Sequence, residues 1–193
     1  MVLRLNSFFI EIENLFIIVL ISFFFSDKIK LFLTSYFVCY LFIIFHELSH
    51  IIFASIFGKK IRKLKLSIAG VCVVFNNNDE LEIIKKIIIY IAGPLANIIL
   101  ALLFINIDFV FEVNIFLAFL NLMPVYPLDG YNIFKCILIF FNKINYLKSI
   151  ESIFLILFFI ISIIIFFMYY NPSLIIFFIY VILIKYFTKN HIK

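Results

Sequence analysis

Charged residues are scarce in this sequence: they make up 14% of the 193 residues, whereas hydrophobic residues make up 66%. Soluble domains are closer to half apolar, so the composition leaves too little polar surface for a body that faces water and excludes an ordinary soluble domain. Cysteine is also scarce, with Cys39, Cys72 and Cys136 in apolar surroundings and no CxxC pair. Three scattered cysteines exclude a disulfide framework, and we interpret them as packing residues.

The N-terminal apolar run lacks the small-residue cleavage site of a secretory signal and is preceded by Glu11 and Glu13. We therefore expect a retained membrane anchor. A spanning helix needs about 20 mostly apolar residues. Runs of this kind predict an all-α membrane protein with about six transmembrane helices, at about 8–25, 31–57, 84–105, 109–123, 150–169 and 173–188.

The formal net charge is +5, and the basic residues gather between the apolar runs. This pattern is typical of the cytoplasmic loops of a membrane protein, so we expect a lipid bilayer and no nucleic acid as a partner. We expect a multi-pass protein of the cell membrane whose two termini are cytoplasmic. In this orientation only Lys28 and Lys30 lie outside. The same orientation places these residues inside: Arg4, Lys59, Lys60, Arg62, Lys63, Lys65, Lys85, Lys86, Lys135, Lys143, Lys148, Lys185, Lys189 and Lys193.

Two connections differ from ordinary loops. Residues 64–75 are rich in β-branched side chains around Gly70 and predict a short membrane-associated β-hairpin between the second and third spans. An ordinary loop is the alternative. Strand edges cannot face hydrocarbon, so such a hairpin must lie against protein or in a wet cavity. In residues 121–135, Pro124 and Pro127 predict that the end of the fourth span is broken.

The second apolar run contains His46-Glu47-Leu48-Ser49-His50. On a helix, positions i and i+4 share a face, so His46 and His50 can present their imidazoles to one zinc ion. Glu47 lies beside that face, where its carboxylate can take a proton from water activated by the metal. A chance HExxH match is common in soluble helices. Ionisable residues inside a membrane segment, however, indicate function by default, so we predict a metal site.

Catalytic zinc has three protein ligands as a rule and keeps one position open, so one ligand is missing. Asp27, Asp79 and Asp108 lie in polar turns. Asp129 follows the two prolines, and the predicted topology brings it to the same membrane half as His50. Asp129 is therefore the preferred candidate, and Glu151 on a later span is the alternative.

Three pieces of the sequence together resemble the site-2 protease family of intramembrane metalloproteases. They are the HExxH segment 46–50, the G-x-x-x-N stretch Gly93–Asn97, and the N-x-x-P-x-x-x-x-D element Asn121–Asp129. The resemblance covers residues 40–135. It implies one zinc ion held by His46, His50 and Asp129, with Glu47 as the catalytic residue.

The same resemblance implies that Asn97 and Asn121 help to hold substrate, and that an edge of the 64–75 hairpin pairs with an unwound substrate strand. Helix packing is the alternative role for Gly93 and Asn97, and helix capping is the alternative for Asn121. The chain looks most like the stage IV sporulation protein FB branch. That branch implies a membrane-tethered substrate such as a sporulation sigma-factor precursor, with membrane inhibitor proteins as further partners.

We thus expect residues 1–193 to form a single polytopic membrane metalloprotease domain with its core at 31–135 and no PDZ or CBS domain. The expected activity is zinc-dependent cleavage of a peptide bond in a membrane-tethered protein. The alternative is a non-proteolytic transporter or scaffold with a metal site. No internal repeat in the sequence supports a transporter.

Overall fold

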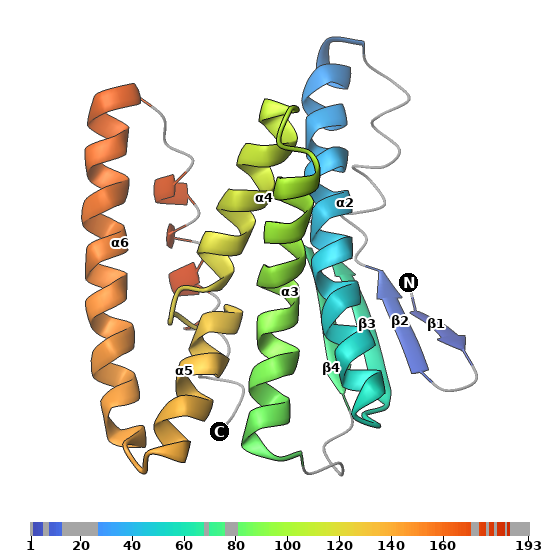
Figure 1. Ribbon diagram of the computed structural model, residues 1–193. Coiled ribbons are helices and arrows are strands. Elements are labelled where there is room, and N and C mark those ends of the chain that lie inside the picture. Colours follow the sequence, from blue (N-terminus) through green and yellow to red (C-terminus); the bar gives the residue numbers. More distant parts are fainter. Residues whose placement is uncertain are drawn as a thin grey trace. The chain divides into compact units, whose positions relative to one another are not determined.

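The computed structural model describes residues 2–5, 8–12, 27–67, 70–75, 81–170, 174–176, 178–179, 181–183 and 185. The chain forms two compact units, Met1–Phe119 and Leu120–Lys193, and each is described by itself. In both units most of the described residues are helical (Figure 1). The predicted helical character is therefore confirmed, although the first unit also contains a sheet.

In the described part of the first unit, the sheet has four strands in the order β1-β2-β3-β4. The pairs β1–β2 and β3–β4 are antiparallel, and β2 pairs with β3 in parallel. The β3–β4 pair is the hairpin predicted at 64–75, with Leu64 opposite Val73 and Ser67 opposite Gly70. The strands are β1 (Val2–Leu5), β2 (Phe8–Ile12), β3 (Ile61–Ser67) and β4 (Gly70–Phe75).

The predicted first span at 8–25 is wrong at its start, because Phe8–Ile12 is strand β2. In this stretch apolar residues alternate with a charge, as in Ile10-Glu11-Ile12 and Leu3-Arg4-Leu5. A period of two residues is typical of a strand. The high overall hydrophobicity of this stretch predicted a membrane helix instead. The rest of the predicted span, residues 13–25, lies outside the described residues.

Among the described residues, the helices of the first unit are α2 (Asp27–Ile56), α3 (Ile83–Leu103) and α4 (Asp108–Asn121), whose last two residues belong to the second unit. α2 ends at Ile56, and the chain turns away at Gly58, whose φ is +79°. The Gly58 N–H bonds to the Ser55 carbonyl and the Lys59 N–H to the Ala54 carbonyl, both at 2.9 Å. This pair of bonds is a Schellman motif, which needs a left-handed residue after the helix.

α2 and α3 lie side by side, and each buries a stripe of residues spaced by four (Figure 1). The stripe on α2 contains Phe42, His46, His50 and Ala54, all at most 7% exposed. The stripe on α3 contains Ile89, Gly93, Asn97 and Ala101. Positions four apart lie on one helix face, so polar residues within the two apolar stripes face the interface between the helices. β4 also packs against α2.

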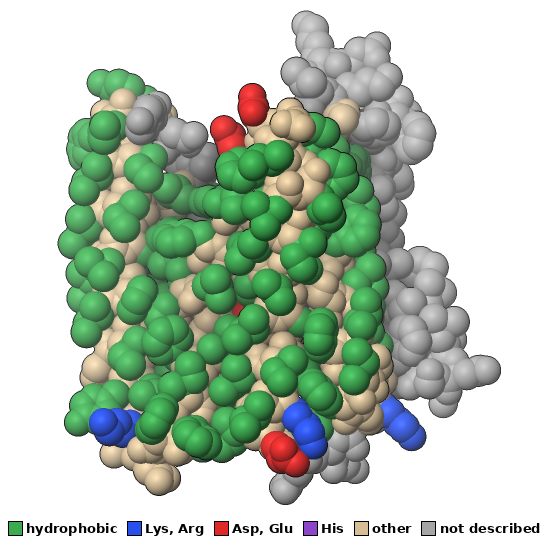
Figure 2. Space-filling model, in the orientation of Figure 1, with side chains coloured by type: hydrophobic (Ala, Val, Ile, Leu, Met, Phe, Trp, Pro, Cys, Tyr) green, Lys and Arg blue, Asp and Glu red, His purple; other side chains and the backbone are tan. Residues whose placement is uncertain are grey.

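The second unit contains α5 (Asp129–Phe140), a short 3-10 turn η1 (Ile144–Tyr146) and α6 (Leu147–Tyr169). A shorter apolar helical segment lies at Leu174–Leu183. α6 exposes large apolar side chains along its length, including Ile153 at 55% and Ile156 at 60%. Figure 2 shows hydrophobic side chains over the visible face of the described helices. Such a surface suits lipid rather than water.

Within the described residues, three helices are long and apolar enough to cross a membrane: Thr34–Ile56, Ile83–Leu103 and Ile144–Met168. They match the predicted second, third and fifth spans. α4 has 14 residues, a length of about 21 Å at 1.5 Å per residue, which is less than the roughly 30 Å of a hydrocarbon core. The prediction of six spans is therefore not confirmed, and the predicted sixth span is described only in part.

Candidate metal centre

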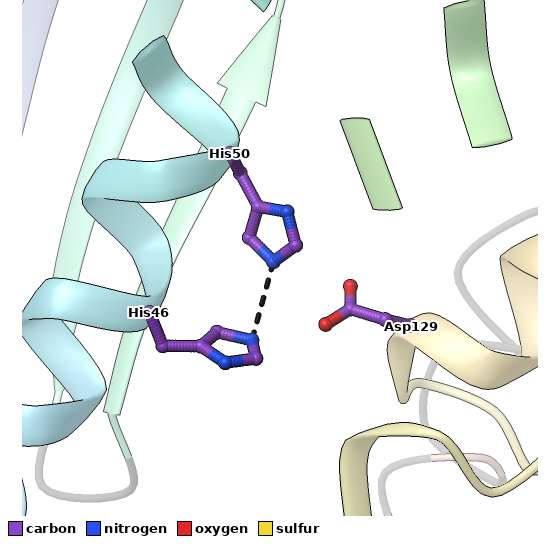
Figure 3. Close-up of side chains that lie close together, drawn as sticks. All are labelled: His46, His50 and Asp129. Atoms are coloured by element: carbon purple, nitrogen blue, oxygen red, sulfur yellow. Dashed lines mark hydrogen bonds between the residues drawn. The ribbon is translucent and has the colours of Figure 1, made fainter. Parts of the chain in front are cut away.

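His46 and His50 lie one helical turn apart on α2 and point toward each other (Figure 3). Their Nε2 atoms are 3.2 Å apart, and the rings meet edge to face with centroids 4.8 Å apart. Both side chains are buried, at 4% and 6% exposure. A helix therefore brings the two imidazoles together by local geometry alone, as the HExxH spacing predicts.

The other ring nitrogen of each histidine contacts an acceptor on α3. The Nδ1–H of His50 donates to the backbone carbonyl of Ile89 at 2.6 Å. The Nδ1–H of His46 donates to Oδ1 of Asn97 at 2.5 Å. A carbonyl oxygen can only accept, so His50 must carry its proton on Nδ1. Its Nε2 lone pair is then directed at the site, which is the tautomer that a metal ligand needs.

For His46, two asparagines on successive helices fix the same tautomer. Nδ2 of Asn114 on α4 donates to the backbone carbonyl of Val110 at 2.9 Å. Oδ1 of Asn114 is therefore free to accept, and Nδ2 of Asn97 donates to it at 2.9 Å. Asn97 must then turn its own Oδ1 toward His46. Asn97 and Asn114 are both fully buried, and the Val110 carbonyl sets the direction of the whole chain of bonds.

Two neutral imidazoles with protonated Nδ1 atoms direct two lone pairs at each other. At 3.2 Å between the Nε2 atoms, this arrangement favours a shared cation, either a metal ion or a proton. Two nitrogen ligands at 2.0–2.1 Å from a tetrahedral zinc ion would be about 3.3 Å apart. The pair therefore fits zinc in both tautomer and spacing.

Gly93 on α3 forms the wall of this site. A Cβ atom built on Gly93 would collide with the His50 ring and would lie 2.6 Å from Nε2 of His46. The absent side chain lets the α3 backbone approach both imidazole rings closely. The G-x-x-x-N stretch thus combines a close approach at Gly93 with an acceptor at Asn97, one helical turn further on.

Asp129 is the first residue of α5 and is half-buried. Its carboxylate, like the imidazoles of His46 and His50, is a side chain of a kind that could hold a metal ion, and Figure 3 draws all three. At the next position, a Cβ on Gly130 would collide with the backbone of Leu122 and Met123. The loop before α5 therefore folds back on the first helical turn, as the two prolines in this segment predict.

Glu47 is half-buried on α2 beside His46, and Asn121 is the half-buried last residue of α4. The resemblance implies a substrate-holding role for Asn97, and that role stays a prediction. In the structure its amide oxygen and nitrogen bond to His46 and Asn114. Asn114 and the Ile89 carbonyl were missed. The signal for Asn114 was available, since it is an amide within the apolar segment Val113–Ala118.

Comparison with known proteins shows similarity to a family, to a curated protein and to a solved structure. Residues 14–187 match the family described as Peptidase M50B-like. Over 150 residues the sequence is 29% identical to the zinc metalloprotease MJ0392 of Methanocaldococcus jannaschii, covering 70% of this chain and 42% of that protein's length. The fold is similar to the solved structure of a site-2 protease from Methanocaldococcus jannaschii, with a TM-score of 0.61 and 23% identity over 94% of this chain and 91% of that one.

Proposed function

This chain belongs to the Peptidase M50B-like family, and from that premise we propose that it is a zinc-dependent endopeptidase that cleaves a membrane-tethered protein within the bilayer. The predicted resemblance to site-2 proteases is confirmed at the level of the family. The observation that carries the proposal is the buried imidazole pair, whose Nε2 atoms face each other at 3.2 Å while both Nδ1 atoms are held by acceptors.

In this proposal His46, His50 and Asp129 are the three protein ligands of one zinc ion. Two imidazoles and one carboxylate are a ligand set of catalytic zinc sites, which keep a further position open. The position of Asp129 at the start of α5 also supports this role, because the N-terminus of a helix favours a carboxylate. When bound, zinc polarises the scissile carbonyl and lowers the pKa of a bound water to about 7.

Glu47 is the proposed general base, because it directly follows His46 on α2 and lies beside the face that carries the two histidines. Its carboxylate accepts a proton from the attacking water as the water oxygen bonds to the scissile carbonyl carbon. When the C–N bond breaks, Glu47 passes that proton to the leaving amine nitrogen. The buried surroundings of the imidazole pair support this chemistry, because they limit the access of bulk water.

The sheet offers a place for the substrate. Among the described strands, β4 is at the end of the sheet order and pairs only with β3, and it packs against α2, which carries the HExxH segment. A substrate segment that unwinds from its helix can add to such an edge through backbone hydrogen bonds. Pairing with β4 would present extended backbone, as a protease requires, since a helix keeps its carbonyls bonded internally.

The proposal also places the chain in the cell membrane with several spans and cytoplasmic termini. Basic residues support this orientation, since Lys59 follows α2 and Lys85 and Lys86 begin α3 at the same end of this helix pair. The substrate class is a membrane-tethered protein. The sigma-factor precursor and the sporulation branch have no support from the comparisons and are not part of the proposal.

The test is cleavage of a reporter protein that carries a membrane-spanning segment, measured together with zinc content. Glu47→Gln should abolish cleavage and retain about one zinc per chain, because the ligands are untouched. The matched control is Glu112→Gln, which neutralises an exposed carboxylate on α4 and should cleave normally. Normal cleavage by the Glu47→Gln protein would exclude this mechanism.

A further inference from the structure

Glu151 is a buried carboxylate in an apolar helix. It lies on α6 within the candidate span Ile144–Met168, where it is the acidic residue among 25. The residue is only 5% exposed. Ionisable groups inside a membrane segment are costly and mark functional positions by default, together with the partner that compensates them.

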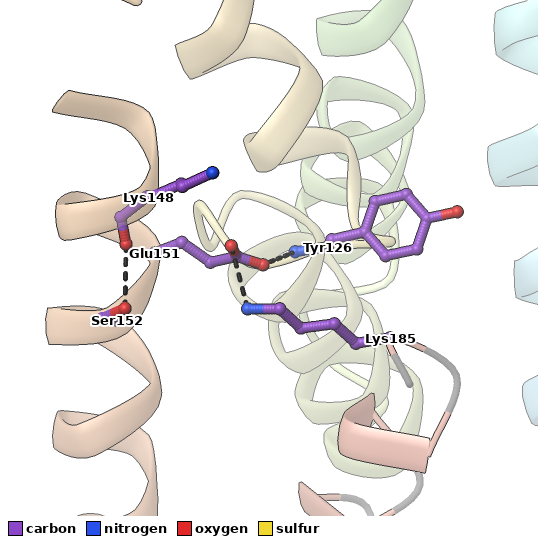
Figure 4. A network of polar contacts seen from close by, with 5 residues as sticks. All are labelled: Tyr126, Lys148, Glu151, Ser152 and Lys185. Carbon is purple, nitrogen blue, oxygen red and sulfur yellow. Dashed lines mark hydrogen bonds and ion pairs between the residues drawn. The ribbon is translucent and has the colours of Figure 1, made fainter. Parts of the chain in front are cut away.

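The two oxygens of Glu151 contact two different segments of the second unit (Figure 4). Oε1 accepts a hydrogen bond from the backbone N–H of Tyr126 at 3.3 Å. Oε2 pairs with the ammonium of Lys185 at 2.9 Å, with side-chain exposures of 7% for Glu151 and 39% for Lys185. Both oxygens are thus occupied by donors of the second unit, which disfavours Glu151 as the third metal ligand.

The Tyr126 amide belongs to the loop between α4 and α5. Pro124 and Pro127 have no N–H to donate. The N–H groups of Met123, Val125 and Leu128 bond to carbonyls of residues 120, 123 and 125 respectively. The N–H of Tyr126 bonds instead to the side chain of Glu151. In apolar surroundings an amide without an acceptor is strongly unfavourable, so Glu151 completes the hydrogen bonding of the loop.

This loop ends at Asp129. The Tyr126 ring packs edge to face on the Tyr131 ring, with centroids 5.5 Å apart. Tyr126 is therefore held at its N–H by Glu151 and at its ring by the first turn of α5. Tyr126 and Tyr131 lie on either side of Asp129 in the sequence, so these contacts restrict the backbone both before and after Asp129.

We infer that Glu151, with Lys185 as its counter-ion, is a positioning residue for the Asp129 carboxylate. It acts through the Tyr126 amide and makes no contact with the substrate. The inference rests on the proposed function, because it takes Asp129 as the third zinc ligand. The Lys185 ammonium lies 2.9 Å from Oε2 of Glu151 as its counter-ion, and a carboxylate is a stronger hydrogen-bond acceptor than a neutral group.

The test is a double-mutant cycle of zinc affinity with Glu151→Leu and Asp129→Ala, measured on the full chain in detergent by competition with a chelating indicator. Partners beyond the direct ligands contribute roughly 10- to 100-fold to metal affinity. We expect Glu151→Leu to lower the affinity about tenfold, near the lower end of that range. In the Asp129→Ala background the same change should have less than about a twofold effect, because the group it positions is gone.

The outcomes separate the inference from the proposed function. If Asp129→Ala leaves zinc affinity unchanged, the proposed ligand set fails and the inference fails with it. If Asp129→Ala weakens zinc binding but Glu151→Leu does nothing, or acts equally in both backgrounds, only the inference is overturned. An equal effect would indicate that Glu151 serves the fold in general.

A conservative pair of changes guards against misfolding of Glu151→Leu. Glu151→Gln combined with Lys185→Met keeps an oxygen that accepts from Tyr126 and leaves no charge without a partner. This protein should bind zinc within about threefold of the wild type, since the positioning bond is retained. A loss as large as that of Glu151→Leu would contradict the role of the Tyr126 bond. Glu112→Gln is again the matched control.

Discussion

Replacement of Asn114 by leucine should weaken zinc binding, although the hydrogen bonds of Asn114 run to Asn97 and to the Val110 carbonyl. In the structure, Asn114 accepts from Nδ2 of Asn97, which in turn accepts from Nδ1–H of His46. Leucine has a similar volume but no acceptor. Nδ2 of Asn97 then loses the acceptor that keeps Oδ1 of Asn97 directed at His46. If the Asn97 amide turns over, its nitrogen faces His46 and favours the His46 tautomer that carries its proton on Nε2. That tautomer cannot bind zinc.

The size of the expected loss of zinc affinity follows from the hydrogen bonds that join Asn114, Asn97 and His46. Removal of the partner of a buried amide costs about 1–3 kcal/mol, and Asn97 is fully buried. Outer partners of a metal-bound histidine contribute about 10- to 100-fold in affinity, which corresponds to about 1.4–2.8 kcal/mol at 1.4 kcal/mol per tenfold. We therefore expect zinc affinity to fall 10- to 100-fold in Asn114→Leu.

The assay is competition with a chelating indicator, combined with nitrogen NMR of the histidines in the zinc-free protein. The spectrum should report Nδ1–H for His46 in the wild type and a mixture of tautomers in Asn114→Leu. The control is Asn114→Asp, which in its neutral form can both accept from Asn97 and donate to the Val110 carbonyl, and should bind zinc nearly as well as the wild type. If Asn114→Leu binds zinc with the affinity of the wild type, the hydrogen bonds from Asn114 through Asn97 do not orient His46.

Three further changes test other parts of the structure. Gly93→Ala should abolish stoichiometric zinc binding, measured by metal analysis, because its Cβ would collide with both imidazoles, whereas the neighbouring Ala92→Gly should bind normally. Gly130→Ala should lower both zinc content and thermal stability, since its Cβ would collide with the Leu122 and Met123 backbone. Unchanged stability would contradict the fold of that loop. Ile156→Lys, at a position 60% exposed on α6, should make membrane insertion less favourable by about 2.5–3.5 kcal/mol in a glycosylation assay, and normal insertion would contradict the assignment of α6 as a span.

The helices and the hairpin were accessible from the sequence because their signals are local. The apolar runs at 31–57, 84–105 and 150–169 correspond to α2, α3 and α6 within a few residues. The strand β2 was missed, because Phe8–Ile12 begins a long apolar run. Its pairing with β3 joins Phe9 to Lys63, and a contact over that distance in sequence leaves no local pattern.

The same distinction applies to the candidate site. His46 and His50 come together because residues four apart lie on one face of a helix, so the HExxH spacing predicts their close approach. The roles of Gly93, Asn97 and Asn114 depend instead on the register between α2, α3 and α4, which single-helix periodicity does not contain. Likewise α5 was not expected, because the prolines before Asp129 indicated a broken chain and gave no sign of where the next helix begins.

The central claim is that two imidazoles and one carboxylate bind a single zinc ion. X-ray absorption of the zinc-loaded protein tests it most directly, since it identifies the ligand atoms. We expect one zinc per chain, with two imidazole nitrogens at about 2.0–2.1 Å and carboxylate or water oxygen at about 2.0–2.2 Å. Asp129→Ala should lose oxygen and keep both imidazoles. A spectrum with sulfur neighbours at about 2.3 Å, from Cys39 or Cys136, or one without imidazole scattering, would contradict the claim.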